Sequence, residues 1–289
     1  MTNATFARLG DRGVVRVTGA DAEKLLQNLI TADLDRLATQ EAVFAGLLSP
    51  QGKILFDFFV IKTADGFLLE TARNKAADLA KRLTLYKLRA NVTLADASPD
   101  YDVYAAWGSA PTPDAAMAYA DPRLPALGWR VIAPAGHKPS GEEASEADYH
   151  AHRIALGVPE GGRDYVLGDT FPHEALFDQI GGVDFDKGCY VGQEVVSRMQ
   201  HRSTARKRVV PITSPGDLPQ GAAVKLGEAQ IGTVGSSTGH RALALVRLDR
   251  IGEAMGKGQP VTVDDAPITV DLPAWVRFTI STKADTGQA

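Results

Sequence analysis

A chain of 289 residues with 44% hydrophobic content is long enough for one large or two modest globular domains. Its formal net charge of -4 argues against a general nucleic-acid-binding protein, which would need a broad basic face. No run approaches the roughly 18 apolar residues of a membrane span, and the first ten residues lack a signal pattern. We therefore predict a cytoplasmic protein with neither membrane nor nucleic-acid partners.

The first half of the sequence alternates strand and helix patterns. Apolar residues recur at helical spacing after Asp21, which is a favoured residue for capping a helix. We predict, in chain order, a strand at 13–18, a helix capped by Asp21, a hairpin of strands at 43–48 and 54–61, a strand at 67–71 and a helix at 76–88. Long parallel crossovers are missing from this order, so we expect an α+β domain.

The second half changes character near residue 204. Residues 111–125 and 134–145 have loop composition, and a helix is predicted over 145–156, ending at Gly157. Beyond residue 204, short strands punctuated by glycine and proline predict a β-barrel. These strands are expected at 208–212, 223–226, 231–234, 243–248, 261–263 and 275–280. The predicted domains are 1–204, which could contain two subdomains, and a barrel at 205–281, followed by a flexible tail at 282–289.

Cys189 is the only cysteine, which excludes an intramolecular disulfide and a cysteine-rich metal cage within one subunit. It precedes a helix predicted from Gln193, and the helix dipole together with Lys187 would favour the nucleophilic thiolate. The alternative is a buried thiol without function. The six histidines share no ligand spacing, so we predict no preformed metal site.

Residues 187–194, Lys-Gly-Cys-Tyr-Val-Gly-Gln-Glu, resemble the signature of the YgfZ-type folate-binding proteins, a branch of the aminomethyltransferase superfamily associated with iron-sulfur cluster assembly or repair. The segments 153–159 and 172–175 match the same family in order and spacing, and 27–33 and 52–57 match more loosely. The resemblance implies an aminomethyltransferase-like ring of subdomains around a central tetrahydrofolate site, with a C-terminal β-barrel. It also implies partners among iron-sulfur client or assembly proteins.

By the same resemblance, Cys189 and Lys187 are the predicted catalytic residues. The predicted folate contacts are Asp57, Glu174, Tyr190, Gln193 and Arg198. Ordinary structural roles are the alternatives: Asp57 as a polar strand residue, Glu174 as a helix cap, Tyr190 as core. The basic residues around Arg198, up to Arg208, could hold the glutamyl tail of folate or form a solvated face.

Two other functions remain open from the sequence. The first is a folate-dependent aminomethyl or one-carbon transferase acting on an amine. Against it, Phe56-Asp57 stands where that enzyme usually has paired aspartates, and Ala155 stands where it tends to have glutamate. The second is a folate-sensing module in which Cys189 is only structural. Whether the protein is an enzyme is therefore left undecided by the sequence.

Overall fold

The computed structural model describes residues 4–111, 116–202 and 205–282. Contacts divide the chain into two units. The first unit comprises residues 1–149 and 180–195, and the second comprises 150–179 and 196–289. Each unit therefore combines segments that are not contiguous in sequence. The domain boundary predicted near residue 204 stays a prediction, and the predicted tail lies outside the described residues apart from Thr282.

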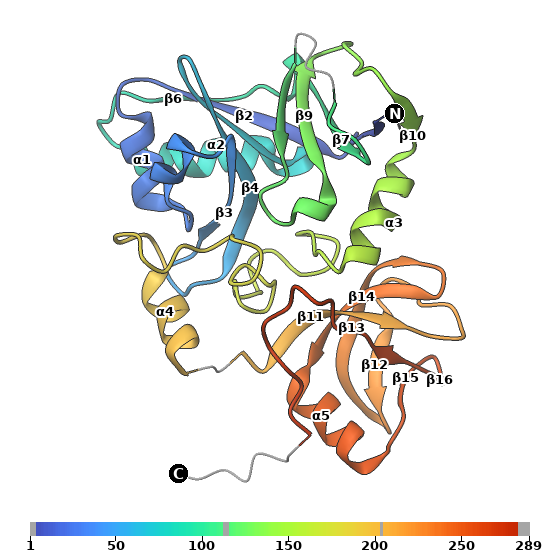
Figure 1. Cartoon of the computed structure of the whole chain (residues 1–289). Helices are drawn as coiled ribbons and strands as arrows, with labels where there is room; N and C mark the ends of the chain where they lie inside the picture. Colours follow the sequence, from blue (N-terminus) through green and yellow to red (C-terminus); the bar gives the residue numbers. More distant parts are fainter. Residues whose placement is uncertain (1–3, 112–115, 203–204, 283–289) are drawn as a thin grey trace. The chain divides into compact units, whose positions relative to one another are not determined.

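The first unit is built on two sheets of five strands each (Figure 1). One sheet is antiparallel and has the order β3 (Ala42–Leu48), β4 (Ile54–Thr63), β5 (Gly66–Ala72), β2 (Arg12–Thr18) and β6 (Thr93–Asp96). The other has the order β10 (Glu142–Ala144), β1 (Thr5–Arg8), β7 (Tyr101–Trp107), β9 (Trp129–Pro134) and β8 (Met117–Ala120). Only the β1–β10 pair in that sheet is parallel.

The predicted hairpin is confirmed as β3 and β4. β3 is buried along its whole length, which explains its continuous apolar sequence. The turn closes through hydrogen bonds from Gly52 N to Ser49 O and from Ser49 N to Lys53 O, both 2.8 Å. Gly52 has a positive φ of 79°, which glycine adopts without steric cost.

A buried polar cluster joins the two sheets of the first unit. Glu70 on β5 accepts hydrogen bonds from Arg12 on β2 and Arg130 on β9, each at 2.9 Å, and from the Tyr119 hydroxyl on β8 at 2.5 Å. All four side chains are buried. Because each donor meets the same carboxylate, the cluster fixes the sheets against one another without leaving that charge unpaired.

Helices α1 (Ala22–Leu29) and α2 (Arg73–Lys87) cover the antiparallel sheet of the first unit. α1 buries Ala22, Leu26 and Leu29, the spacing of one helical face. The predicted cap, Asp21, makes no side-chain cap hydrogen bond, and its carboxylate accepts instead from Asn91 N at 2.7 Å. The part of the chain that the structure describes also contains three short 3-10 helices, at Leu34–Ala38, Ser98–Asp100 and Pro125–Leu127.

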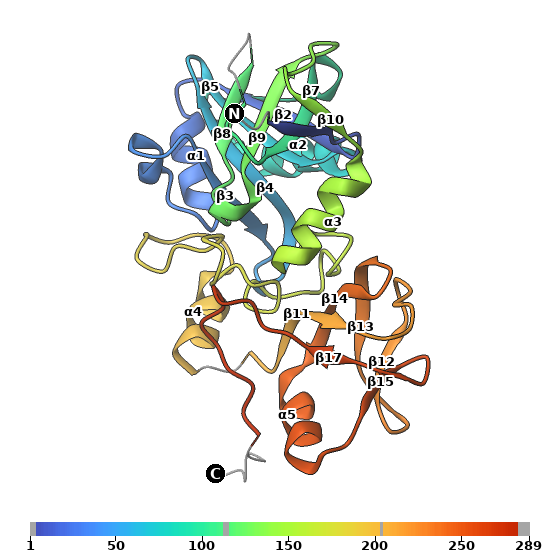
Figure 2. The same cartoon turned by 45° about the vertical axis from the view of Figure 1, so that its right-hand side comes forward.

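The second unit contains a seven-stranded antiparallel sheet with α5 (Leu248–Lys257) packed on it (Figure 2). The strand order is β16 (Ala266–Pro267), β15 (Val261–Val263), β12 (Ala223–Leu226), β13 (Ala229–Thr238), β14 (Arg241–Arg247), β11 (Lys207–Thr213) and β17 (Thr269–Val270). Two further helices, α3 (Glu146–Leu156) and α4 (Gln193–Arg202), begin in the first unit and continue into the second. Among the described residues, no helix is long and apolar enough to cross a membrane.

Several predictions for the loops and the C-terminal end were wrong. The predicted loops at 111–125 and 134–145 contain the short strands β8 and β10, although 112–115 lie outside the described residues. The predicted strand at 275–280 has no regular structure. Its Trp275 instead donates from Nε1 to Leu156 O at 2.9 Å, which anchors an irregular segment inside the second unit.

Candidate functional site around Cys189

Cys189 is exposed in the first unit, and its thiol is free. Lys187, two residues earlier, is only 6% exposed, and Tyr190, the next residue, only 8%. Gly188 is exposed beside the cysteine. The chain therefore rises to the surface at residues 188–189 between two buried side chains, which presents the thiol to solvent from a fixed position.

The ammonium of Lys187 holds this segment to the end of α1. Its Nζ donates to the carbonyl oxygens of Gln27, Ile30 and Ala32, each at 2.8 Å. The last carbonyls of a helix lack partners within the helix and carry its negative end charge, so a lysine ammonium is a favourable partner for them. All three N–H donors of the ammonium are used in these contacts.

These contacts revise the predicted role of Lys187. The sequence suggested a cation acting on the thiol, whereas the structure directs the ammonium to backbone carbonyls and gives Lys187 an anchoring position. Burial lowers the pKa of Lys187 to about 8, against the opposing effect of Asp33, Asp184 and Asp35. Its contacts are those of a structural anchor, and a catalytic role for Lys187 stays a prediction.

Thr31 joins the Cys189 segment to β3. Its hydroxyl donates to Gly182 O at 2.5 Å and accepts from Gly46 N at 2.7 Å, while its own carbonyl accepts from Asp184 N at 2.9 Å. Asp184 then accepts from the backbone N of Asp186 at 2.9 Å and of Lys187 at 3.2 Å, which shapes the turn before the cysteine. The sequence analysis missed Thr31 and Asp184, although Thr31 lies in the quoted segment 27–33.

Two glycines let the Cys189 segment approach the β3–β4 turn. A Cβ atom added to Gly192 would lie 2.6 Å from Ser49 O and 3.1 Å from the Cα of Gly52. Gly192 also has a positive φ of 83°. Any larger residue at position 192 would collide with the hairpin backbone, so this glycine is needed for close packing just before α4.

Tyr190 packs beside the anchor. The Lys187 Nζ lies 5.5 Å from the centroid of the Tyr190 ring, within the range of a cation–π contact. Burial, together with the charge of Asp184, raises the pKa of the Tyr190 hydroxyl, so the side chain is neutral at physiological pH. Gln193 follows, and its backbone N donates to Tyr190 O at 3.3 Å as α4 begins.

The other predicted folate contacts fall in different places. Asp57 is buried on β4 in the first unit and pairs in register with Gly46, the glycine that contacts Thr31. Glu174 belongs to the second unit and accepts from Phe171 N at 2.8 Å, a local contact within a run of turns. Arg198 is exposed on the part of α4 that belongs to the second unit. The first unit thus brings Asp57, Tyr190 and Gln193 into one body with Cys189, and Glu174 and Arg198 lie in the other.

Arg208 has a structural role in the second unit. It is buried, forms two hydrogen bonds to Asp178 at 2.8 and 2.9 Å, donates to His173 O, and lies over the Phe278 ring. These side chains line a cavity of about 470 Å³. Its guanidinium is already paired and buried, so Arg208 is a poor candidate for the glutamyl tail of folate and is not part of a solvated face.

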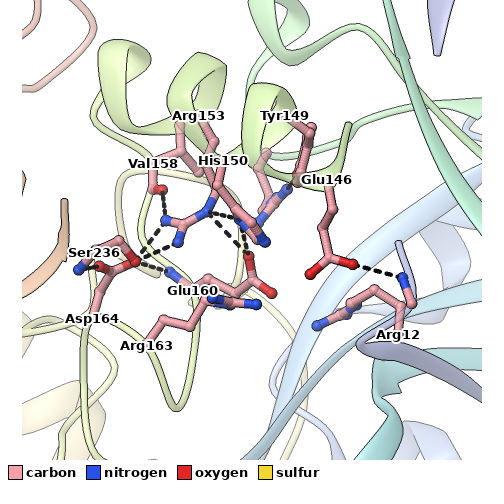
Figure 3. A network of polar contacts seen from close by, with 12 residues as sticks. Arg12, Glu146, Tyr149, His150, Arg153, Val158, Glu160, Arg163, Asp164 and Ser236 are labelled. Atoms are coloured by element: carbon pink, nitrogen blue, oxygen red, sulfur yellow. Dashed lines mark hydrogen bonds and ion pairs between the residues drawn. The ribbon is translucent and has the colours of Figure 1, made fainter. Parts of the chain in front are cut away.

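Arg153, the first residue of the quoted segment 153–159, organises a buried network in the second unit (Figure 3). Its guanidinium pairs with Asp164 at 2.7 Å and Glu160 at 3.2 Å, and donates to the Ser236 hydroxyl at 2.5 Å and Val158 O at 3.2 Å. Asp164 also accepts from Ser236 N and Glu160 N. The network ties the residues after α3 to β13.

Comparison with known proteins gives the family. Residues 9–116 match the family model of the GCVT N-terminal domain, and residues 206–278 match that of the CAF17 C-terminal beta-barrel domain. A crystal structure of the glycine cleavage system aminomethyltransferase T from Bartonella henselae is similar, with a TM-score of 0.73 and 15% identity over 95% of this chain and 87% of that one. The predicted α+β aminomethyltransferase-like fold with a C-terminal barrel is confirmed.

Curated relatives are named iron-sulfur cluster assembly factor IBA57, mitochondrial, or its homologue. The protein from Mycosarcoma maydis is 38% identical over 234 residues, which are 73% of this chain and 58% of that relative. The human protein is 33% identical over 278 residues, 84% of this chain and 78% of the relative. The chain thus spans little more than half of the first relative's length.

The prediction of a cytoplasmic location is contradicted by these relatives, which are named mitochondrial proteins in fungi, mouse and human. That prediction rested on the lack of a signal pattern in the first ten residues, and such a lack does not fix a compartment. The identity and coverage of the relatives, together with the two matched domains, show that this chain belongs to the IBA57 family of iron-sulfur cluster assembly factors.

Proposed function

We propose that this chain assists the maturation or repair of iron-sulfur proteins by binding tetrahydrofolate and using Cys189 as its reactive group. The observation that carries the proposal is the exposed thiol between two anchored residues, Lys187 and Tyr190. Membership of a family whose members are named iron-sulfur cluster assembly factors supports the same role.

The chemistry of a single thiol limits how Cys189 acts. A thiolate is a soft ligand suited to iron and to sulfur-containing species. A stable cluster is usually held by four thiolates, and this chain has one cysteine. The proposed contact with a cluster or client is therefore transient, with the remaining ligands supplied by the partner.

The test is complementation of a strain that lacks its own member of this family. Expression of this chain is expected to restore the activity of aconitase-type enzymes, which depend on clusters, while glycine cleavage is already intact in the deletion strain. Both activities are measured in extracts, and the deletion strain carrying the empty vector is the control. Normal cluster enzymes together with failed glycine cleavage in the deletion strain would instead identify an aminomethyltransferase.

Folate binding predicts a separate result on the purified protein. The buried Asp57 carboxylate suits the amide and amino hydrogens of a pterin, and the fold is that of an aminomethyltransferase. At 100 times its dissociation constant a ligand stabilises the native state by about 2.7 kcal/mol, which raises the melting temperature by several degrees. This rise is measured by thermal unfolding in the presence of tetrahydrofolate. An unrelated anion without a pterin ring, at the same concentration, is the control. An unchanged melting temperature with every reduced folate would remove the cofactor from the proposal.

A further inference from the structure

α2 exposes two leucines on the side that does not face the sheet. Leu85 is 64% exposed and Leu88 is 86% exposed. The helix already buries a complete apolar face, formed by Ala76, Leu79, Ala80 and Leu83, in the core of the first unit. The two exposed leucines are therefore additional to the pattern that packing requires.

Leu88 is also held in an unfavourable backbone conformation. It is the residue that ends α2, with φ 46° and ψ -106°. Glycine or asparagine is usual where a helix ends with positive φ, because a branched or bulky side chain is sterically opposed there. Neither burial nor backbone preference accounts for a leucine at this position. Strain of this kind, kept at an exposed site, points to a role for the side chain itself.

Cations surround the two leucines. Lys81 lies four residues before Leu85, so the two share one side of the helix, while Leu88 follows the last helical residue. Arg82 and Arg89 are close to the leucines in sequence. All three cations are exposed, and within the described residues none of them forms an ion pair. This local excess of positive charge stands on a chain whose net charge is -4.

We propose that Lys81, Arg82, Leu85, Leu88 and Arg89 form a docking surface, which we call the α2 surface, for a protein that offers an apolar pocket rimmed by carboxylates. Leu88, fixed by its backbone, is the anchor that enters the pocket, and the cations meet the acidic rim. The charge complementarity argues for an acidic partner. An interfacial membrane helix would lay a complete apolar face into the lipid. The complete apolar face of α2 is instead packed in the core of the first unit.

The first experiment replaces Leu88 with glycine in the full chain. Relief of the strain is expected to raise the melting temperature by about 2–4 °C, while loss of the anchor weakens docking by about 30-fold, as for a typical hot-spot residue. The functional readout rests on the proposed function: cluster-enzyme activity in the complemented strain is expected to fall. Val166→Ser, which removes an apolar side chain of the second unit that is 65% exposed, is the control and should leave that activity unchanged.

A more stable Leu88→Gly protein with full cluster-enzyme activity would overturn the α2 surface while leaving the proposed function intact. If the deletion strain itself has normal cluster enzymes, the proposed function fails, and the second experiment still decides the docking question. The two failures are therefore distinguishable.

The second experiment places a photo-crosslinking residue at position 85 in living cells, with position 166, an exposed site of the second unit, as the control. The expected adduct joins this chain to an acidic surface of another protein, and it is lost in the Arg82→Glu, Arg89→Glu double variant but kept in Lys24→Glu. An adduct with a second copy of this chain, an adduct with lipid only, or no adduct at position 85 would each overturn the proposal.

Discussion

Replacing Cys189 with serine is expected to abolish the proposed maturation activity while leaving the fold intact. The thiol is exposed, and its neighbours, not its own side chain, hold the segment in place. Surface changes of this kind alter the free energy of unfolding by less than about 0.5 kcal/mol. Serine keeps the size of the side chain but is a far poorer ligand for iron. Thermal unfolding and cluster-enzyme activity in the complemented strain measure the two halves of the prediction.

A moved thiol provides the control for this variant. Adding Ser197→Cys to Cys189→Ser restores the number of thiols but places the new one within α4. It is not expected to restore activity, because the presentation of residues 188–189 depends on the anchors on either side. Wild-type activity in Cys189→Ser alone would show that the cysteine is only structural, and folate binding by that variant would then leave the folate-sensing module as the better description.

Arg153→Met is expected to cause a large loss of stability. Arg153 and Asp164 are completely buried, and removal of the guanidinium leaves the Asp164 carboxylate in the interior without its ion pair at 2.7 Å and removes the 3.2 Å contact to Glu160. Breaking such a buried pair costs about 3–5 kcal/mol. Chemical denaturation followed by circular dichroism would measure the change in the free energy of unfolding.

Arg247→Met is the matched control for that measurement. Arg247 pairs with Asp249 at 2.6 Å, but both side chains are about 40% exposed. Exposed pairs contribute about 0–1 kcal/mol, so the control variant should unfold almost as the wild type does. Equal losses in the two variants would mean that the buried network around Arg153 is not a main source of stability.

The elements that the sequence predicted well are those whose signal is local. The hairpin of β3 and β4 has two continuous apolar strands and a turn of suitable residues, and α2 has apolar residues at helical spacing. α5 was missed because its sequence contains Gly252 and Gly256. Gly252 is explained only by tertiary structure, since a Cβ atom there would lie 1.8 Å from Ser281 O.

Part of the candidate site was predictable because its signal is also local in sequence. The motif around Cys189 correctly located the start of α4 at Gln193. It could not show where the Lys187 ammonium points, because its partners Gln27, Ile30 and Ala32 lie 155–160 residues earlier in the chain. Glu174 was similarly ambiguous, since a carboxylate three residues after Phe171 fits both a ligand contact and the local hydrogen bond to Phe171 N that is observed.

The distance in sequence between Lys187 and the end of α1 also sets an order of events during synthesis. At about 5–20 residues per second, a ribosome needs roughly 8–32 s to add the 160 residues between Gln27 and Lys187. During that interval the Lys187 ammonium is not there to donate hydrogen bonds to the carbonyl oxygens at the end of α1. The first unit can therefore reach its final form only after residues 180–195 have been synthesised. Until then, neither Cys189 nor the lysine that anchors its segment is present.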